Sequence, residues 1–222
     1  STDNAAAIGQ FLDQVTGREE WGVKGFFDRG QAETAGLARL EGQGQPATSP
    51  GARYFQTQRL RLRTPVAADA AAIAALAGDF DVTRMTARMP HPYLRIDAEG
   101  FISRAAQSAS FDNQTLVIEH QTEGPIGSIG LFPSETGQPE IGYWIGKPYW
   151  GQGLASEALR GLQDWVKNVQ GRRYLTAGHF ADNPVSGQVL IKAGFLYTGE
   201  VRTLFSQARN TTVPSRMMVW LA

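Results

Sequence analysis

Two glycines, Gly151 and Gly153, flank a glutamine in the stretch YWGQGLASEAL, residues 149–159. An amphipathic helical pattern begins at this turn and continues over residues 153–169. The first N–H groups of a helix have no intrahelical partners, and the helix dipole favours negative charge at that end. The turn is therefore either a tight connection or a place where backbone N–H groups hold a phosphate.

Two familiar phosphate motifs do not fit this turn. A Walker A loop requires Lys and Ser or Thr where Gln152 and Gly153 stand, which argues against nucleotide hydrolysis. A dinucleotide fingerprint requires a third glycine where Ser156 stands. No Lys or Arg lies between Pro148 and Leu159, so we expect a bound phosphate to be held mainly by backbone N–H groups.

The surrounding pattern predicts an α/β domain with a mixed sheet. Strands are expected at 58–64, 115–120, 126–132, 140–145 and 174–180, with two more within 195–222. Helices are expected at 4–16, 65–79, 97–108, 153–169 and 183–194, the last with Asn183 as N-cap, Pro184 at its first position and Gly194 as its stop. The Gly- and Gln-rich stretch 42–51 reads as a linker, which predicts an amino-terminal arm over 1–54 and a main domain over 55–222.

The composition excludes several function classes. The 222 residues carry 21 Lys and Arg against 21 Asp and Glu, so we expect neither a nucleic-acid binder nor a membrane-surface binder. The absence of cysteine excludes disulfides, a cysteine nucleophile and thiolate metal sites. The three histidines are far apart, and we expect no metal. No apolar run reaches membrane-spanning length, so a soluble, cytoplasmic protein is expected.

A third motif fits the turn better. Gly153 and Ala155 fill the last two positions of [Q/R]-x-x-G-x-[G/A], the pyrophosphate loop of the GNAT superfamily of N-acetyltransferases. The segments IGSIGLF, EIGYWIGKPYWGQGLASEAL and DNPVSGQVLIKAGFLYTGEV, in this order, resemble the branch that contains the ribosomal-protein N-terminal acetyltransferases. The resemblance covers about 57–222, and Trp150 stands at the usual Gln or Arg position, as is common in this branch.

The resemblance implies the GNAT fold, a mixed and mostly antiparallel sheet with splayed central strands and flanking helices, and acetyl-CoA as co-substrate. The pantetheine arm would enter between strands 140–145 and 174–180, where a backbone N–H near Tyr143, Trp144 or Ile145 would polarise the thioester carbonyl. The backbone of the following residues would hold the pyrophosphate: Trp150, Gly151, Gln152, Gly153, Leu154, Ala155 and Ser156. Asn183 would contact the cofactor arm, besides its possible role as a plain N-cap.

The implied reaction is acetyl transfer to a primary amine by direct attack in a ternary complex, since no cysteine can carry the acetyl group. Ser186 matches a position that donates a proton to the thiolate, although a polar first-turn residue is an equal alternative. Glu140 is the candidate base, and an exposed strand-end glutamate is as plausible. His179 fits either a base or a structural histidine. A downstream glutamate used as base in this branch is replaced by Phe205, which argues against a ribosomal substrate.

Several alternatives stay open at this point. The acceptor is a protein N-terminus, a free amino acid or another small amine, and the protein is a possible homodimer. A non-catalytic acyl-CoA-binding module of the same fold is the competing function. Residues 15–54 resemble pieces of the gas-vesicle accessory proteins of the F/L family, or else form an arm that packs Trp21, Phe26 and Phe27 on its own domain or on a second subunit.

Overall fold

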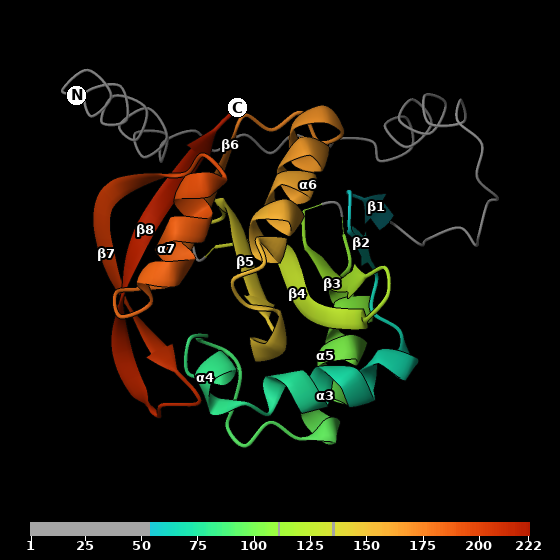
Figure 1. Cartoon of the computed structure of the whole chain (residues 1–222). Coiled ribbons are helices and arrows are strands. Elements are labelled where there is room, and N and C mark those ends of the chain that lie inside the picture. The colour runs from blue at the N-terminus through green and yellow to red at the C-terminus, as the bar shows by residue number, and fades with distance from the viewer. Residues whose placement is uncertain (1–53, 111, 135) are drawn as a thin grey trace, which may run out of the picture. The chain divides into compact units, whose positions relative to one another are not determined.

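The computed structural model describes residues 54–110, 112–134 and 136–222, which form one eight-stranded sheet with helices on both faces (Figure 1). The strand order is β1-β2-β3-β4-β5-β6-β8-β7, and every neighbouring pair is antiparallel except β5 with β6. The strands are β1 (Tyr54–Gln56), β2 (Leu60–Arg63), β3 (Gln114–His120), β4 (Gly124–Pro133), β5 (Pro139–Ile145), β6 (Tyr174–Phe180), β7 (Leu196–Ser206) and β8 (Thr211–Leu221). The expected mixed, mostly antiparallel sheet is confirmed.

The helices of the described residues lie near their predicted positions, except for α4, which was not predicted. They are α3 (Ala70–Ala77), α4 (Phe80–Thr83), α5 (Arg95–Ser108), α6 (Leu154–Asn168) and α7 (Pro184–Lys192), with short 3-10 turns η1 (Ala67–Asp69) and η2 (Lys147–Tyr149). The helix predicted over 65–79 is found over a shorter range: its first turn is η1, it continues directly as α3 to Ala77, and α4 begins as a separate helix at Phe80. Asp79 accepts a hydrogen bond from the N–H of Asp81 at 2.8 Å and so caps a new helix directly after α3 ends.

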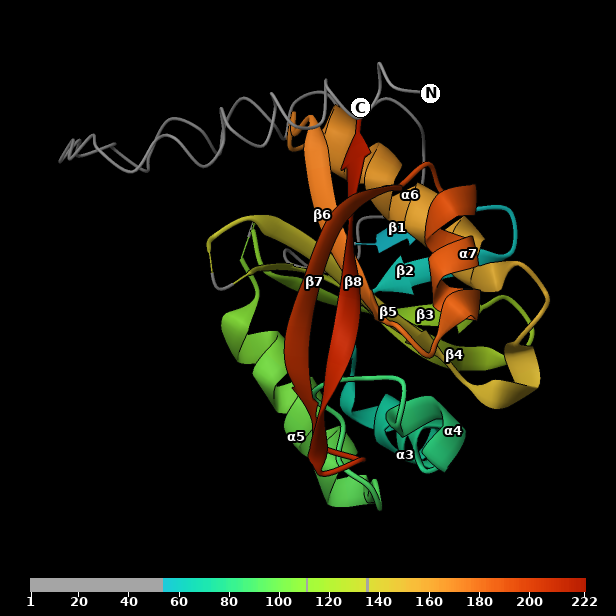
Figure 2. The same ribbon diagram turned by 90° about the vertical axis from the view of Figure 1, so that its left-hand side faces the viewer.

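The helices cover both faces of the sheet (Figure 2), and an apolar cluster on each face holds them to it. On one face α6 and α7 pack against the strands, and the predicted stripe of α6 is buried at Leu154, Leu159 and Leu162. On the other face α3 and α5 pack against the sheet, in a cluster that includes Ile73 of α3 and Val117 of β3. Because side chains alternate across a strand, each strand residue can be assigned to one of these faces.

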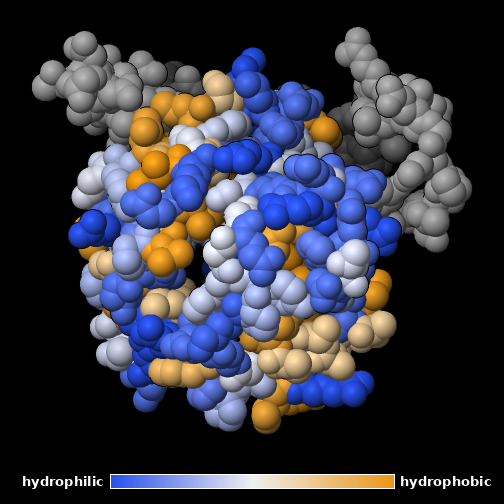
Figure 3. All heavy atoms as spheres, viewed as in Figure 1, coloured by the Kyte–Doolittle hydropathy of each residue, from blue (hydrophilic) through white to orange (hydrophobic). Residues whose placement is uncertain are grey.

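β5 and β6 separate soon after they meet. Their parallel pairing consists of Glu140 with Thr176 and Ile141 with Ala177. Beyond these pairs β5 continues to Ile145 and β6 to Phe180 without pairing to each other, which confirms the expected splayed central strands. We call this separation the β5–β6 gap. The surface is hollowed between α7 and β5, above α4, in the view of Figure 3.

The helix expected at 4–16, the linker at 42–51 and the aromatic residues of the arm lie outside the described residues. The boundary at residue 55 therefore stays a prediction. In the described ranges, no helix is both long and apolar enough to cross a bilayer. Nor do three or more His, Asp or Glu side chains of this part of the chain gather as a metal site would require.

Candidate active site

The turn before α6 exposes a run of backbone donors. Gly151 and Gly153 have φ of +74° and +76°, a region that side-chain-bearing residues rarely adopt. Among the described residues, no hydrogen-bond acceptor is found for the backbone N–H groups from Gly151 to Ser156. Trp150 differs from the expectation, because its N–H donates to the Lys147 carbonyl at 3.2 Å as part of η2. The donor run thus begins at Gly151.

The side chains of this segment point away from the donors. Leu154 and Ser156 are buried, with 1% and 6% of the whole residue exposed, so the solvent-exposed part of the turn is formed by Gly151, Gln152 and Gly153. The Gln152 amide donates to the Pro148 carbonyl at 3.1 Å and closes the turn. The turn is therefore a run of N–H groups at a helix start that have no acceptor among the described residues, an arrangement that suits a phosphate.

A cation that sequence reasoning missed lies beside the turn. Arg59 precedes β2 and is separated from Gln152 by 93 positions, yet its Nη1 donates to the Gln152 carbonyl at 3.1 Å. Its Nε donates to the Glu157 carboxylate in the first turn of α6 at 2.7 Å. The segment between Pro148 and Leu159 contains no Lys or Arg, and the fold brings Arg59 to it from elsewhere in the chain.

The edge of β5 that faces the gap offers further donors. The Trp150 indole donates to the Ile145 carbonyl at 2.7 Å, while the Gly146 N–H pairs with Ile126 of β4 at 2.8 Å. In a strand, the N–H and C=O of one residue leave on the same edge and neighbouring residues alternate. The N–H groups of Tyr143 and Ile145 therefore point to the β5–β6 gap, and that of Trp144 points to β4.

Two of the predicted catalytic residues meet directly. The Tyr143 and Ser186 hydroxyl oxygens are 2.9 Å apart, across the space between β5 and α7. Burial raises the pKa of Tyr143 to about 12, which exceeds the opposing effect of the Ser186 hydrogen bond. Asn183 accepts the Ser186 N–H at 3.1 Å, so the predicted N-cap is confirmed, and its amide nitrogen takes no part in that cap.

Glu140 lies on the other face of the sheet. Side-chain alternation along β5 places Tyr143 with Ile141 and Ile145 on the α6–α7 face, and Glu140 on the opposite face. The Glu140 carboxylate forms an ion pair with Arg202 of β7 at 3.8 Å. The structure thus brings Ser186 and Tyr143 together but separates both from Glu140.

His179 has the environment of a structural histidine. It is 5% exposed, and its two ring nitrogens contact the Phe180 carbonyl at 2.8 Å and the Tyr197 hydroxyl at 2.9 Å. With the proton on the nitrogen that faces the carbonyl, the other nitrogen accepts from Tyr197, and the neutral ring is satisfied. His91 packs edge-on against Phe80 at 5.0 Å, away from these groups.

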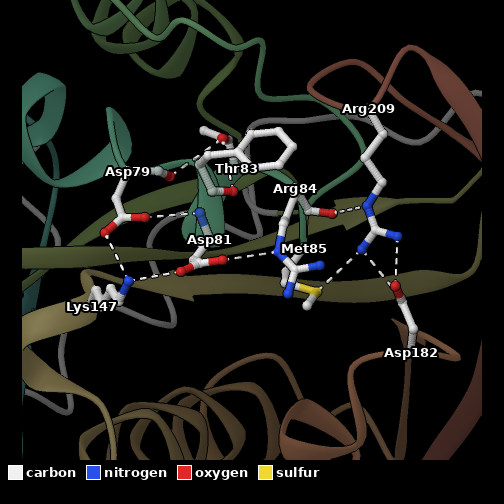
Figure 4. Close-up of polar contacts among 9 residues, drawn as sticks. Asp79, Asp81, Thr83, Arg84, Met85, Lys147, Asp182 and Arg209 are labelled. Atoms are coloured by element: carbon white, nitrogen blue, oxygen red, sulfur yellow. Dashed lines mark hydrogen bonds and ion pairs between the residues drawn. The ribbon is translucent and has the colours of Figure 1, made fainter.

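Polar contacts tie α4 to the end of β5 (Figure 4). Lys147 follows β5 by two residues, and its ammonium contacts the Asp81 carboxylate at 2.7 Å and that of Asp79 at 3.6 Å. Asp81 also accepts from Arg84 at 3.1 Å. The hydrogen bond from Lys147 is the leading cause that holds the pKa of Asp81 below its ordinary value.

A second set of contacts ties the same segment to the end of β6. Arg209, in the β7–β8 turn, donates to the Arg84 carbonyl at 2.5 Å and to the Asp182 carboxylate at 2.7 Å. Asp182 follows β6 by two residues. We call Asp81, Arg84, Lys147, Asp182 and Arg209 the α4 brace, since through them the segment around α4 is joined to both strands that border the gap (Figure 4).

The comparison with protein families identifies the family to which the chain belongs. The family model described as the acetyltransferase (GNAT) domain matches residues 59–196, more than half of the chain. This chain belongs to the GNAT acetyltransferase family. The weaker amino-terminal resemblance to gas-vesicle proteins finds no support in these matches.

Two curated relatives share parts of this domain. The uncharacterized N-acetyltransferase p20 of Bacillus licheniformis is 30% identical over 120 residues, which cover 49% of this chain and 63% of that protein. The ribosomal-protein-serine acetyltransferase of Escherichia coli is 38% identical over 61 residues, 27% of this chain and 34% of that protein. The chain thus spans less than two thirds of the length of either relative.

The GNAT fold also occurs in a solved structure of high similarity. RimJ of Mycobacterium smegmatis, in complex with CoA-disulfide, superposes with a TM-score of 0.64 at 19% identity. The match covers 77% of this chain and 87% of RimJ. At this identity the likeness shows the GNAT fold, as the sequence predicted.

The residues of this GNAT domain fit acetyl-CoA as a ligand. The donor run from Gly151 to Ser156 suits a diphosphate, and the N–H groups of Tyr143 and Ile145 line one edge of the gap into which a pantetheine arm would extend. Another hollow, of about 370 Å³, is lined by Gln56, Arg61, Glu119 and their neighbours at the far end of the sheet. It adjoins neither a helix start nor the gap, so we assign it no chemistry.

Proposed function

We propose that the protein is an acetyl-CoA-dependent N-acetyltransferase that acts on a primary amine by direct attack in a ternary complex. One observation carries the proposal. The donor run from Gly151 to Ser156 opens beside the β5–β6 gap, so that one extended ligand with a diphosphate and a thioester arm reaches both. Membership of the GNAT family supports the same assignment.

The bound thioester supplies an activated acetyl group, and the chain supplies the donors around it. In the proposed reaction the amine nitrogen forms a bond to the acetyl carbon, and the carbon–sulfur bond breaks. The N–H of Tyr143 or Ile145 stabilises the charge on the thioester oxygen. Ser186 donates a proton to the leaving sulfur, and the Tyr143 hydroxyl, 2.9 Å away, stabilises the Ser186 oxygen by a hydrogen bond. Solvent then returns a proton to Ser186.

The amine enters from the opposite face of the sheet in this proposal. There Glu140 is the candidate base that takes the proton from the attacking amine, directly or through water. The amine would lose its proton to Glu140 on one face of the sheet, and the thiolate would gain a proton from Ser186 on the other. The two proton transfers would therefore be separated in space. Because Glu140 is already paired with Arg202 at 3.8 Å, the non-catalytic acyl-CoA-binding module remains the alternative.

An acceptor panel that follows release of free CoA thiol separates the two functions. The panel contains peptides with free amino termini, free amino acids, polyamines and aminoglycosides. The proposal predicts amine-dependent thiol release and acetylated product by mass spectrometry for at least one class. A protein that binds CoA but acetylates no member of the panel would instead be the binding module.

A further inference from the structure

Arg59 makes an unusual set of contacts with the loop before α6. Its Nε donates to one Glu157 carboxylate oxygen at 2.7 Å, and its Nη1 donates to the Gln152 carbonyl at 3.1 Å. Its third nitrogen, Nη2, lies 3.8 Å from the point where a Cβ on Gly153 would sit. The Arg59 side chain is 41% exposed, so one edge of the guanidinium is bound to the loop while part of it stays open to solvent.

Glu157 fixes the guanidinium in this position. Its other carboxylate oxygen accepts from the Thr57 hydroxyl at 2.6 Å and from the Arg59 backbone N–H at 2.7 Å. The Glu157 side chain is 15% exposed. Burial pushes the pKa of Glu157 upward, and the hydrogen bonds from Thr57 and Arg59 outweigh this effect, so its pKa lies below the ordinary value. Glu157 is therefore an anion that ties the β1–β2 turn to the first turn of α6.

The contact with Gln152 sets the direction of a loop donor. In a trans peptide the C=O and the following N–H point in opposite directions. Because the Gln152 carbonyl points to Arg59, the Gly153 N–H leaves on the opposite side of the loop. Gly153 adopts φ of +76°, and without Arg59 its flexible peptide could rotate and turn this donor away.

We propose that Arg59 is a positioning residue for the diphosphate of the acyl-CoA substrate: held by Glu157, it orients the Gln152–Gly153 peptide and places a positive charge beside the donor loop. The inference rests on the proposed use of acetyl-CoA. It assigns to Arg59 the charge that the loop itself lacks between Pro148 and Leu159. Lysine cannot replace it fully, because an ammonium does not present two fixed donors to two acceptors.

Arg61, two residues after Arg59 and within β2, offers a matched control. It carries the same charge, is 51% exposed and pairs with Glu119 at 2.9 Å. As it faces the hollow at the far end of the sheet, its removal changes the net charge equally but leaves the loop intact. The informative variants are thus Arg59→Ala, Arg59→Lys and Arg61→Ala, each checked for folding by circular dichroism and melting.

Calorimetry with CoA, dephospho-CoA and pantetheine tests the inference without any turnover. Dephospho-CoA lacks the 3′-phosphate but keeps the diphosphate, and pantetheine lacks both. We expect Arg59→Ala to weaken CoA and dephospho-CoA equally, by about tenfold or more, and pantetheine not at all. Arg59→Lys should lie between wild type and Arg59→Ala, and Arg61→Ala should match wild type.

Each other outcome has a distinct meaning. Unchanged CoA affinity in folded Arg59→Ala or Arg59→Lys protein overturns the inference, while CoA binding by wild type still supports the proposed function. A loss for CoA but not for dephospho-CoA also overturns it, because Arg59 would then act on the 3′-phosphate. An equal loss for pantetheine indicates a merely structural role. Absence of CoA binding by wild type would contradict the proposed function itself.

Discussion

The hydroxyls of Tyr143 and Ser186 form one hydrogen bond at 2.9 Å, and either oxygen can be its donor. In such a pair Ser186 can donate its proton outward while the buried Tyr143 phenol keeps its own proton and hydrogen-bonds the Ser186 oxygen. The pKa of Tyr143, raised to about 12 by burial, keeps it neutral throughout any physiological pH. The pair is therefore suited to donate a proton rather than to accept one.

Titration of the tyrosines tests this state. Tyr143 and Tyr93 both have a pKa raised to about 12, by burial in each case. We expect Tyr143→Phe to remove absorbance at 295 nm that develops near pH 12. In the unfolded chain the pKa of a tyrosine is about 10, below the value of about 12 that Tyr143 has in the folded protein. The stability that this difference contributes is therefore present below pH 10 and is lost as the pH rises toward 12. Loss of a tyrosine that titrates near pH 10 would contradict the burial argument.

Ser186→Ala tests the proton donor. The variant should lower kcat by about tenfold or more, with CoA affinity nearly unchanged, since the interaction gains strength only as negative charge develops on sulfur. Steady-state kinetics together with calorimetry measures both quantities. If kcat is unchanged while chemistry limits the rate, Ser186 is only the first-turn residue of α7 that Asn183 caps.

Gly153→Val tests the loop. The side chain would strain a residue at φ of +76° and would extend toward the Arg59 guanidinium, whose Nη2 lies 3.8 Å from the added Cβ. We expect the affinity for CoA to fall by at least tenfold, about 1.4 kcal/mol. Gly171→Val is the control, because Gly171 has φ of +66° with no atom near its missing Cβ. It should cost similar stability and leave CoA affinity intact. If Gly153→Val and Gly171→Val bind CoA with equal affinity, the loop does not bind the phosphates.

Some of these residues were accessible from the sequence and others were not. The glycines at 151 and 153 and the cap at Asn183 follow from local rules, because backbone conformation and helix ends depend on near neighbours. The pairing of Arg59 with Glu157 spans 98 positions and leaves no local pattern. Only the fold, which lays the β1–β2 turn against α6, reveals it.

At the level of elements, the α4 brace joins the two strands that diverge. A short helix such as α4 has little stability of its own, so its place depends on tertiary contacts. Lys147 and Asp182 each stand two residues beyond a strand of the gap, and both are tied to the segment around α4. We infer that these contacts help to fix the width of the gap at its open end.

Arg209→Ala tests this brace. Arg209 is 16% exposed and bonds a carboxylate and a carbonyl, so its loss should cost roughly 1–3 kcal/mol of unfolding free energy and lower kcat/KM. Arg95→Ala is the control, because Arg95 forms a surface pair with Glu99 at 70% and 48% exposure and should cost less than about 1 kcal/mol. Denaturant unfolding and steady-state kinetics make the comparison. Identical behaviour of the two variants would show that the brace is only a surface network.

Strands and helices with regularly spaced apolar residues could be predicted from the sequence, but the points at which they end could not. β6 occupies residues 174–180 as expected, because buried and partly buried residues alternate along most of the strand. The helix predicted over 65–79 ends at Ala77, and the side-chain cap at Asp79 starts α4, a second helix that the apolar pattern did not predict. The splay of β5 and β6 was expected from the resemblance alone, since strand pairing is a non-local property.

At the scale of the whole molecule, the amino-terminal residues lie outside the described part, and their expected role as a packing arm stays a prediction. Deletion of residues 1–53 should leave CoA affinity intact, because every loop contact named above comes from residues 57–186. If the arm buries Trp21, Phe26 and Phe27, the truncated protein should melt earlier or dissociate from a dimer. Light scattering and melting curves that match the full-length protein would exclude a packed arm.

The central claim is that one ligand spans the donor loop and the β5–β6 gap, and a crystal structure with CoA tests it most directly. We predict the diphosphate within hydrogen-bond distance of backbone N–H groups between Gly151 and Ser156, with Arg59 alongside. The arm should enter the gap past Tyr143 and Ile145, and the sulfur should lie near the Ser186 hydroxyl. A diphosphate bound elsewhere, or a sulfur remote from Ser186 and the gap, would contradict the account.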